Sequence, residues 1–90
     1  METIQILIQG YVQGVYFRDF IKERAKELKL TGYVKNRDRD KIEAKVEGHE
    51  AKLKKFLEII KQGPPGAEIK EFKVAKQPYK NEFKGFSIKY

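Results

Sequence analysis

The sequence predicts an α+β sandwich in which two helices cover one face of an antiparallel sheet. Several short segments alternate apolar and polar residues, which is typical of strands with one buried face. Two other segments repeat their apolar residues every three or four positions, with charged residues between them, as amphipathic helices do. A single sheet with both helices on the same side buries all of these apolar faces together.

The first half of the chain reads as strand, helix, strand, strand. Residues 3–9 alternate isoleucine with polar residues and predict a strand, and an apolar stripe at helical spacing begins at Phe17. Residues 31–36 predict a second strand, and residues 42–47 alternate again. Because only the polar turn 37–40 separates these two strands, we expect them to pair as a hairpin.

The second half predicts another helix followed by two strands. Gly48 ends the hairpin, and the Gly-Pro-Pro at 63–65 stops the helix. That helix is predicted by the apolar stripe of Leu53, Phe56, Leu57 and Ile60. Residues 67–75 predict a strand with a bulge, since its apolar residues change phase, and residues 83–90 predict a short last strand. With right-handed crossovers, this β-α-β-β-α-β order plus a terminal strand is the ferredoxin-like fold.

Length and composition exclude several kinds of protein. The 90 residues fit one compact domain spanning residues 1–90. The absence of cysteine excludes disulfides and thiolate metal sites, and one histidine, His49, is too few for a histidine zinc site or a Ser-His-Asp triad. No apolar run could span a membrane and the N-terminus lacks a signal-peptide pattern, so we expect a cytoplasmic protein without a membrane partner.

The chain is strongly basic. Its net charge is +7 and its pI about 9.6, which favours an anionic partner without choosing between phosphate metabolites, nucleic acids and acidic surfaces. Charged residues make up 37% of the chain against roughly 25% in an average domain, and the excess is mostly lysine and glutamate. With one methionine and no cysteine, this composition favours a heat-adapted protein.

The loop V-Q-G-V-Y-F-R at residues 12–18 joins the first predicted strand to the first helix. Backbone N–H groups in such a turn can converge on an anion, and the helix N-terminus adds unpaired donors and a partial positive charge. Gly14 lets the backbone approach a bound group closely, and Arg18 offers a planar fork of donors suited to phosphate oxygens. On spacing alone, an ordinary turn with a solvated Arg18 explains the loop as well, because short glycine-containing loops are common.

Two motifs resemble the signatures of the acylphosphatase family. G-Y-V-Q-G-V-Y-F-R at residues 10–18 is similar to the first signature, and G-Y-V-K-N at residues 32–36 is similar to the second, where the family often has tryptophan at the position of Tyr33. The segment G-P-P-G-A-E-I at 63–69 and the ending F-S-I-K-Y are similar to the family as well. The resemblance follows the family's order through nearly the whole chain.

The resemblance implies an enzyme that hydrolyses the carboxyl-phosphate bond of a small-molecule acyl phosphate, giving a carboxylate and phosphate without a metal or other cofactor. Arg18 would bind the phosphate, and Asn36 would position the attacking water. The backbone of the loop would cradle the phosphate through Gln13, Gly14, Val15, Tyr16, Phe17 and Arg18. We expect the enzyme to act as a monomer with no nucleic-acid partner.

This chemistry needs few protein groups. The leaving carboxylate needs little or no protonation, and phosphoryl transfer is loose, so catalysis is mainly positioning and charge stabilisation. Asn36 can accept a hydrogen bond from water, but its amide is no base, and we expect a phosphate oxygen of the substrate to take the proton. One departure concerns the hairpin turn, where Asp40 stands at the family's usual glycine and a left-handed conformation would cost some energy.

Two other functions stay open on the residues alone. The predicted order of elements also occurs in RNA-recognition domains, and K-G-F-S-I-K-Y at 84–90 partly matches their aromatic strand motif. The match is one residue short and lies on the last strand. The third strand, residues 42–47, carries no aromatic residue and two glutamates that we expect to be exposed. A non-catalytic regulatory module is the other alternative, and the presence of both Arg18 and Asn36 in their motifs argues against it.

Overall fold

The structure is a computed structural model that describes residues 1–12 and 16–90. Its elements follow the predicted order of strands and helices, with a short strand at the end. In chain order they are β1 (Glu2–Tyr11), α1 (Phe17–Glu27), β2 (Thr31–Asn36), β3 (Lys41–Gly48), α2 (Glu50–Gln62), β4 (Glu68–Gln77) and β5 (Phe86–Lys89). Among the described residues, no helix is long and apolar enough to cross a membrane.

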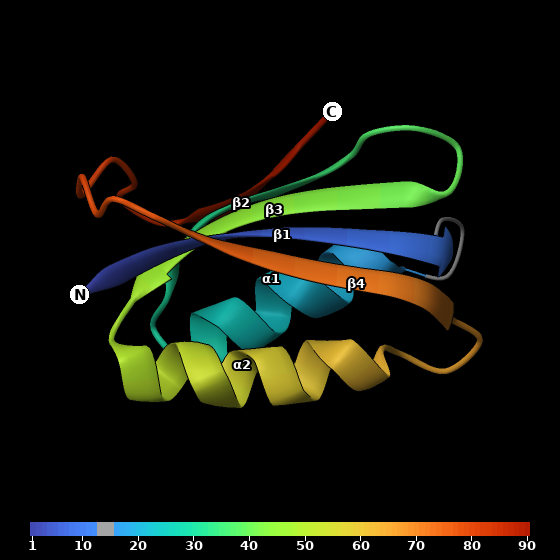
Figure 1. The fold of residues 1–90 in the computed structure, drawn as a ribbon, viewed down its shortest axis with the longest axis horizontal. Coiled ribbons are helices and arrows are strands. Elements are labelled where there is room, and N and C mark those ends of the chain that lie inside the picture. Colours follow the sequence, from blue (N-terminus) through green and yellow to red (C-terminus); the bar gives the residue numbers. More distant parts are fainter. Residues whose placement is uncertain (13–15) are drawn as a thin grey trace.

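The strands form one sheet in the order β4-β1-β3-β2-β5, and both helices lie against the same face of it (Figure 1). This arrangement confirms the predicted fold class. The sheet is antiparallel except at its edge, where β5 pairs with β2 in parallel. The reason is topological: β4 runs opposite to β1 and β2, and the segment 78–85 reverses the chain before it reaches the far edge.

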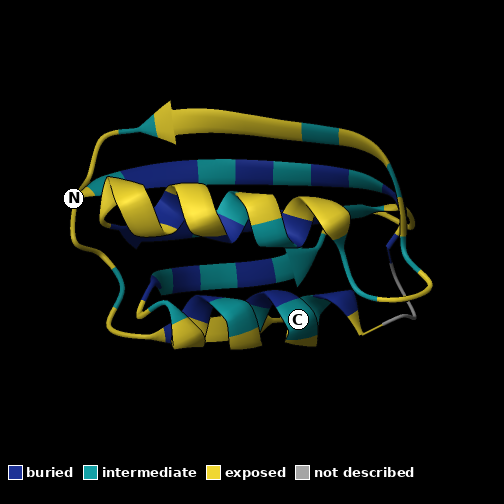
Figure 2. Cartoon of the chain, turned by 90° about the horizontal axis from the view of Figure 1, so that it is seen from below, coloured by how far each residue is buried: buried dark blue, intermediate teal, exposed yellow. Residues whose placement is uncertain are grey.

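The core lies between the helices and the face of the sheet that they cover. Along β1 the buried and half-buried residues alternate, and each helix turns a buried stripe toward the sheet (Figure 2). In these elements the buried face is the apolar face that the sequence predicted, because burial removes apolar side chains from water. The largest contributions come from Ile4, Ile6, Ile8, Phe17, Ile21, Ile42, Val46, Leu53, Phe56 and Ile60.

The predicted bulge lies in β4. Gln9 of β1 pairs with Glu71, but Gly10 pairs with Ile69, which leaves Lys70 without a partner in β1. The extra residue lets Ile69 and Phe72 both pack against the core although they are three positions apart. The change of phase in the sequence therefore reported a real irregularity of the strand.

The outer face of the sheet, away from the helices, corrects one expectation. Glu43 and Glu47 of β3 are only 9% and 1% exposed, where the alternation of the strand had predicted exposed side chains. The segment 78–85 covers part of this face: the Lys80 N–H donates to Glu47 at 3.5 Å, and the ring of Phe83 packs edge-on against Tyr33, with 5.8 Å between the ring centres. The hydroxyl of Thr3 also donates to Glu47, at 3.0 Å.

Candidate active site

The ends of three strands and the start of one helix meet at one end of the sheet. This edge is formed by the strand ends and is distinct from the lateral edges, which are β4 and β5. β1 and β2 both run antiparallel to β3, so they run parallel to each other, and β5 runs parallel to β2. All three strands therefore run toward the same end of the sheet, where α1 also begins; in Figure 1, β1 ends at the right and β5 ends near the C-terminus at the top. The two sequence motifs end there too, the first with Arg18 at the start of α1 and the second with Asn36 at the end of β2.

The end of β1 is fixed to the β2–β3 hairpin. The N–H of Gly10 donates to the carbonyl of Asp40 at 2.9 Å, and the side chain of Gln9 donates to the Asp40 carboxylate at 3.0 Å. Gly10 has φ +146°, and a Cβ here would lie 2.0 Å from the carbonyl oxygen of Glu68. Only glycine fits this position, so the loop toward α1 starts from a rigid point.

The hairpin turn does not use the left-handed conformation that the family's usual glycine suggested. Outside glycine, the described residues with positive φ are Tyr16, Lys29 and Asn81, and Asp40 is not one of them. The N–H of Arg37 donates to the carbonyl of Lys41 at 3.0 Å and closes the turn. Asp40 therefore causes no backbone strain, because its φ is not positive. Its carbonyl and carboxylate accept the hydrogen bonds from β1 instead.

Helix α1 begins abruptly. Its N-cap residue, Tyr16, has φ 58° and ψ 30°, a left-handed conformation, and makes no side-chain capping hydrogen bond. Tyr16 is 81% exposed, whereas the next residue, Phe17, is buried against Gly63 after the end of α2. A non-glycine residue in this conformation costs about 1–3 kcal/mol and persists where the surroundings hold it, as at binding sites. Of the predicted cradle, Gln13, Gly14 and Val15 lie outside the described residues.

Arg18 points toward the end of β5. The carbon of its guanidinium group lies 5.0 Å from the centre of the Tyr90 ring, within reach of a cation–π contact. Lys89 pairs with Lys35, so Tyr90 comes level with Asn36 on the neighbouring strand. Through Tyr90, Arg18 of α1 is therefore linked to the end of β5, the strand that pairs with β2 and its last residue, Asn36. The position of Tyr90 beside Arg18 was not read as part of a site from the sequence.

Asn36 is the last residue of β2 and pairs with Ile42. It lies two residues after the buried Val34, so its side chain is on the helix side of the sheet, the side of α1. Its Oδ1 atom is buried and has no hydrogen-bond partner among the described residues. Buried acceptors are almost always paired, with protein or with water. This oxygen is therefore suited to receive a hydrogen bond from a molecule held at the site.

The described residues offer no metal site. No three His, Cys, Asp or Glu side chains in this part of the chain are close enough together to hold an ion. The groups that the structure does gather at the edge are a guanidinium, a helix N-terminus and an amide oxygen. Such groups bind oxyanions and orient water, because they present fixed positive charge and a hydrogen-bond acceptor.

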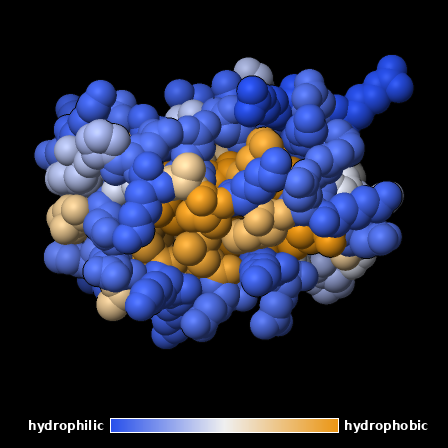
Figure 3. Space-filling model, viewed as in Figure 1, coloured by the Kyte–Doolittle hydropathy of each residue, from blue (hydrophilic) through white to orange (hydrophobic). Residues whose placement is uncertain are grey.

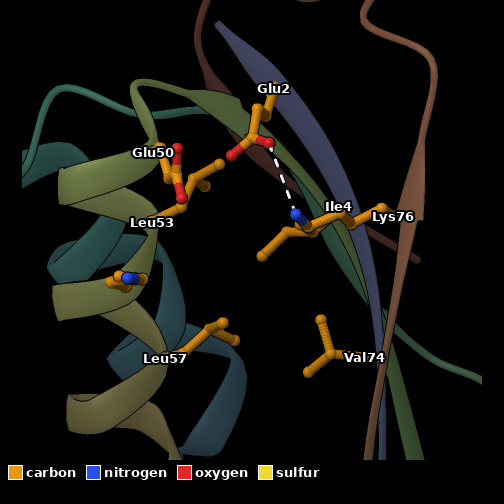
Figure 4. A pocket seen from close by; sticks show the side chains of 8 residues that line it. Glu2, Ile4, Glu50, Leu53, Leu57, Val74 and Lys76 are labelled. Atoms are coloured by element: carbon orange, nitrogen blue, oxygen red, sulfur yellow. Dashed lines mark ion pairs between the residues drawn. The ribbon is translucent and has the colours of Figure 1, made fainter.

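A hollow of about 200 Å³ lies elsewhere, between α2 and β4. Apolar side chains gather at the centre of this face of the molecule (Figure 3). Leu53 and Leu57 of α2 face Val74 of β4 across the hollow, and an ion pair of 3.7 Å between Glu2 and Lys76 lies at one end (Figure 4). Neither Arg18 nor Asn36 lines it, so the hollow is separate from the site at the strand ends.

Comparison with known proteins identifies the family. The acylphosphatase family model matches residues 4–88. This chain belongs to the acylphosphatase family. An acylphosphatase of Aeropyrum pernix is 42% identical over 87 residues, which cover 96% of this chain and 86% of that relative. An acylphosphatase of Bacillus licheniformis is 41% identical over 90 residues, the whole of both chains.

Solved structures agree. The crystal structure of acylphosphatase from Bacillus subtilis matches with a TM-score of 0.95 and 38% identity over the whole of both chains. The resemblance read from the motifs is confirmed, and with it the enzyme class, the hydrolysis of acyl phosphates. In this acylphosphatase, the two signature motifs lead to the same edge of the sheet although β3 lies between their strands.

Proposed function

We propose that this acylphosphatase binds the phosphoryl group of its substrate between Arg18 and the backbone of residues 13–18, and that Asn36 orients the attacking water. The observation that carries the proposal is that the α1 N-terminus, Arg18 and the Asn36 oxygen, which has no partner among the described residues, lie at the same end of the sheet. The first two attract an oxyanion, and the third accepts a hydrogen bond from water.

Phosphate binding rests on fixed positive charge. The N-terminus of an α-helix presents unpaired N–H groups and about half a positive charge, and the N-cap residue of α1, Tyr16, makes no side-chain hydrogen bond that would satisfy these donors. Arg18 adds a planar fork that can donate two parallel hydrogen bonds to phosphate oxygens.

Hydrolysis then needs a water molecule in line with the bond that breaks. Asn36 accepts a hydrogen bond from this water and so directs a lone pair of the water oxygen toward phosphorus. As the new P–O bond forms, the bond to the carboxyl oxygen breaks, and the carboxylate leaves with the electron pair. The water proton passes to a phosphate oxygen, because the amide of Asn36 is no base. The loose transition state is stabilised by Arg18 and the loop N–H groups, and no metal ion is required.

The same proposal covers the setting of the reaction. Residues 1–90 form one domain, supported by the single sheet and core that all elements share. The enzyme acts as a monomer, since every group assigned to the site comes from one chain. We place it in the cytoplasm, as expected from the sequence. Its substrate is a small acyl phosphate. The residues assigned to the site bind the phosphoryl group, and none is assigned to the acyl part.

The decisive experiment is hydrolysis of an aryl acyl phosphate, such as benzoyl phosphate, in excess chelator. We expect the wild type to turn over and Arg18→Ala to lose both binding and turnover, because the guanidinium contacts the phosphoryl group before and during the reaction. Arg24→Ala is the matched control: Arg24 lies on the same helix, pairs with Glu27 at 2.8 Å and contacts the Phe20 ring instead.

Two results would overturn the proposal. Full activity of Arg18→Ala would remove Arg18 from the site, and activity that disappears with chelator would contradict the metal-free reaction. If the folded wild type hydrolysed no acyl phosphate, titration with RNA at several salt concentrations would test the nucleic-acid alternative, since phosphate contacts give a steep salt dependence.

A further inference from the structure

A cluster of charged and polar side chains lies on the outer face of the sheet, behind Asn36. Tyr33, Lys35 and Arg37 alternate along the end of β2, so their side chains are on the face opposite to Asn36. One carboxylate contacts all three. Glu43 of β3 accepts a hydrogen bond from the Tyr33 hydroxyl at 2.7 Å and lies 3.9 Å from Lys35 Nζ and 3.7 Å from Arg37 Nη1.

The register places Glu43 opposite Lys35, the residue that precedes Asn36. Lys35 pairs with Glu43 and Asn36 pairs with Ile42, and the Arg37 N–H reaches Lys41. The two cations that Glu43 holds are therefore the two chain neighbours of Asn36, one on each side. Strand pairing ends at Asn36, and the ends of strands open most easily. A carboxylate that holds both neighbours restrains the backbone at the point where the strand stops.

Glu43 is suited to this task because it is nearly buried. It is 9% exposed, so water screens its contacts less than it screens an ordinary surface ion pair. Removing its charge would leave two cations on the same strand, two residues apart, without the group that separates and fixes them. Removing one partner of a poorly hydrated ion pair destabilises a protein more than replacing both partners by apolar residues.

We propose that Glu43 is a positioning residue for acyl phosphate hydrolysis: by holding Lys35 and Arg37 on the outer face, it fixes the direction of the Asn36 amide on the inner face. The proposal rests on the proposed function of Asn36. It follows from the pleat of the strand, in which the orientation of a residue is set by the neighbours that point the other way. A displacement of about 1 Å at a positioning group can cost about 100-fold in rate.

Tyr33 joins this cluster to the far edge of the sheet. Its hydroxyl donates to Glu43, while its ring packs against Phe83 and lies 4.2 Å from Lys89 Nζ, on β5. Burial and the hydrogen bond to Glu43 raise the pKa of Tyr33 to about 12, so the hydroxyl stays protonated and donating at neutral pH. Glu43 therefore connects β3 through β2 to β5, the strand whose end carries Tyr90.

The test is the steady-state kinetics of Glu43→Gln. We expect kcat to fall about 10- to 100-fold with KM unchanged or lower, because the water is misdirected while the surroundings of the anionic substrate become more positive. Glu82→Gln is the matched control, since Glu82 also lies beside the outer face and pairs with Lys45 at 2.8 Å. It removes the same charge without touching Lys35 or Arg37, and its kcat should be that of the wild type.

Arg37→Gln gives a second, milder variant, because Arg37 is exposed and its loss leaves Glu43 paired with Tyr33 and Lys35. We expect a smaller fall in kcat in the same direction. The double variant Glu43→Gln/Arg37→Gln should lose no more than Glu43→Gln alone, since both changes break one network. Additive losses would contradict the proposal, and so would an unchanged kcat in folded Glu43→Gln.

A measurement without substrate separates this inference from the proposed function. The chain has two asparagines, Asn36 and Asn81, whose side-chain NH₂ groups give NMR signals. In Glu43→Gln we expect the Asn36 signals to shift and broaden while those of Asn81 stay in place. Unmoved Asn36 signals would overturn the positioning role. Moved signals with an unchanged kcat would show that the direction of the Asn36 amide does not affect turnover, which contradicts both the role of Glu43 in hydrolysis and the proposed role of Asn36.

Discussion

At the scale of the residue, the proposed mechanism depends on a single oxygen atom. The Oδ1 atom of Asn36 is buried at the end of β2 and has no partner among the described residues. A buried acceptor without a partner costs about 1–3 kcal/mol. Such a cost is tolerated where the partner arrives with the substrate, and water for hydrolysis is such a partner.

Asn36→Ala tests this role directly. We expect kcat to fall about 100- to 1,000-fold, the usual loss for one preorganised polar group, and KM to change much less. The physical reason is that water orientation matters in the transition state, whereas Arg18 and the loop bind the phosphate in both states. Asn81→Gly is the control, because Asn81 is an exposed loop residue with φ 51° that glycine adopts freely. Equal kcat for Asn36→Ala and the wild type would remove Asn36 from the mechanism.

At the scale of the element, the hairpin of β2 and β3 has two faces with different tasks. Its inner face packs Val34, Ile42 and Ala44 into the core and ends in Asn36. Its outer face holds the cluster around Glu43, including a tyrosine with a pKa raised to about 12. Since successive residues share a backbone and point in opposite directions, we expect a change on one face to affect the other.

The raised pKa of Tyr33 predicts a loss of stability in alkali. Its protonated form is favoured in the folded state, so its contribution is fully present below pH 10, the ordinary value, and is lost as the pH rises toward 12. We expect the free energy of unfolding of the wild type to fall more steeply in this window than that of Tyr33→Phe. Chemical denaturation at several pH values measures it. Parallel curves for the two proteins would contradict the assignment.

The alternation of residues in the sequence predicted the elements well and the outer face poorly. Ile4, Ile6 and Ile8 marked β1 because one face of that strand meets the core, and the phase change after Ile69 marked the bulge. Glu43 looked like a solvated residue of an exposed face. It is nearly buried because Tyr33, Lys35 and Arg37 contact its carboxylate, and the alternation of residues along one strand does not encode such contacts between strands.

The candidate site was predictable only in part, for a similar reason. Arg18 and Asn36 belong to recognisable motifs, so the sequence could propose a role for each, and these roles stay predictions. The contact between Arg18 and Tyr90 depends on β5 pairing in parallel with β2, which residue spacing alone does not reveal. The expected strain at Asp40 did not occur, because the turn closes without a left-handed residue there.

At the scale of the whole molecule, composition and ion pairs bear on heat resistance. Charged residues make up 37% of the chain, and several of them pair in the structure, among them Arg24 with Glu27 and Lys45 with Glu82, both at 2.8 Å. The desolvation penalty of such pairs decreases with temperature, so networks of them favour stability in heat.

We therefore expect a thermal midpoint above the range of about 45–65 °C in which ordinary domains melt. Differential scanning calorimetry at neutral pH measures it. A scan in 1 M salt supplies the control, because screening weakens the exposed pairs and should lower the midpoint if they contribute. A midpoint within the ordinary range at low salt would show that the composition has another origin.

Strand β3 holds the two motifs in position relative to each other, although it belongs to neither. It contributes no side chain to the proposed site, yet it lies between β1 and β2, whose ends lead to the groups that do. A fragment that stopped at Asn36 would contain both motifs in full and would have nothing to hold them side by side. Catalysis therefore depends on completing the sheet, and recovery of turnover during refolding would report the assembly of the whole molecule instead of the recovery of any one segment.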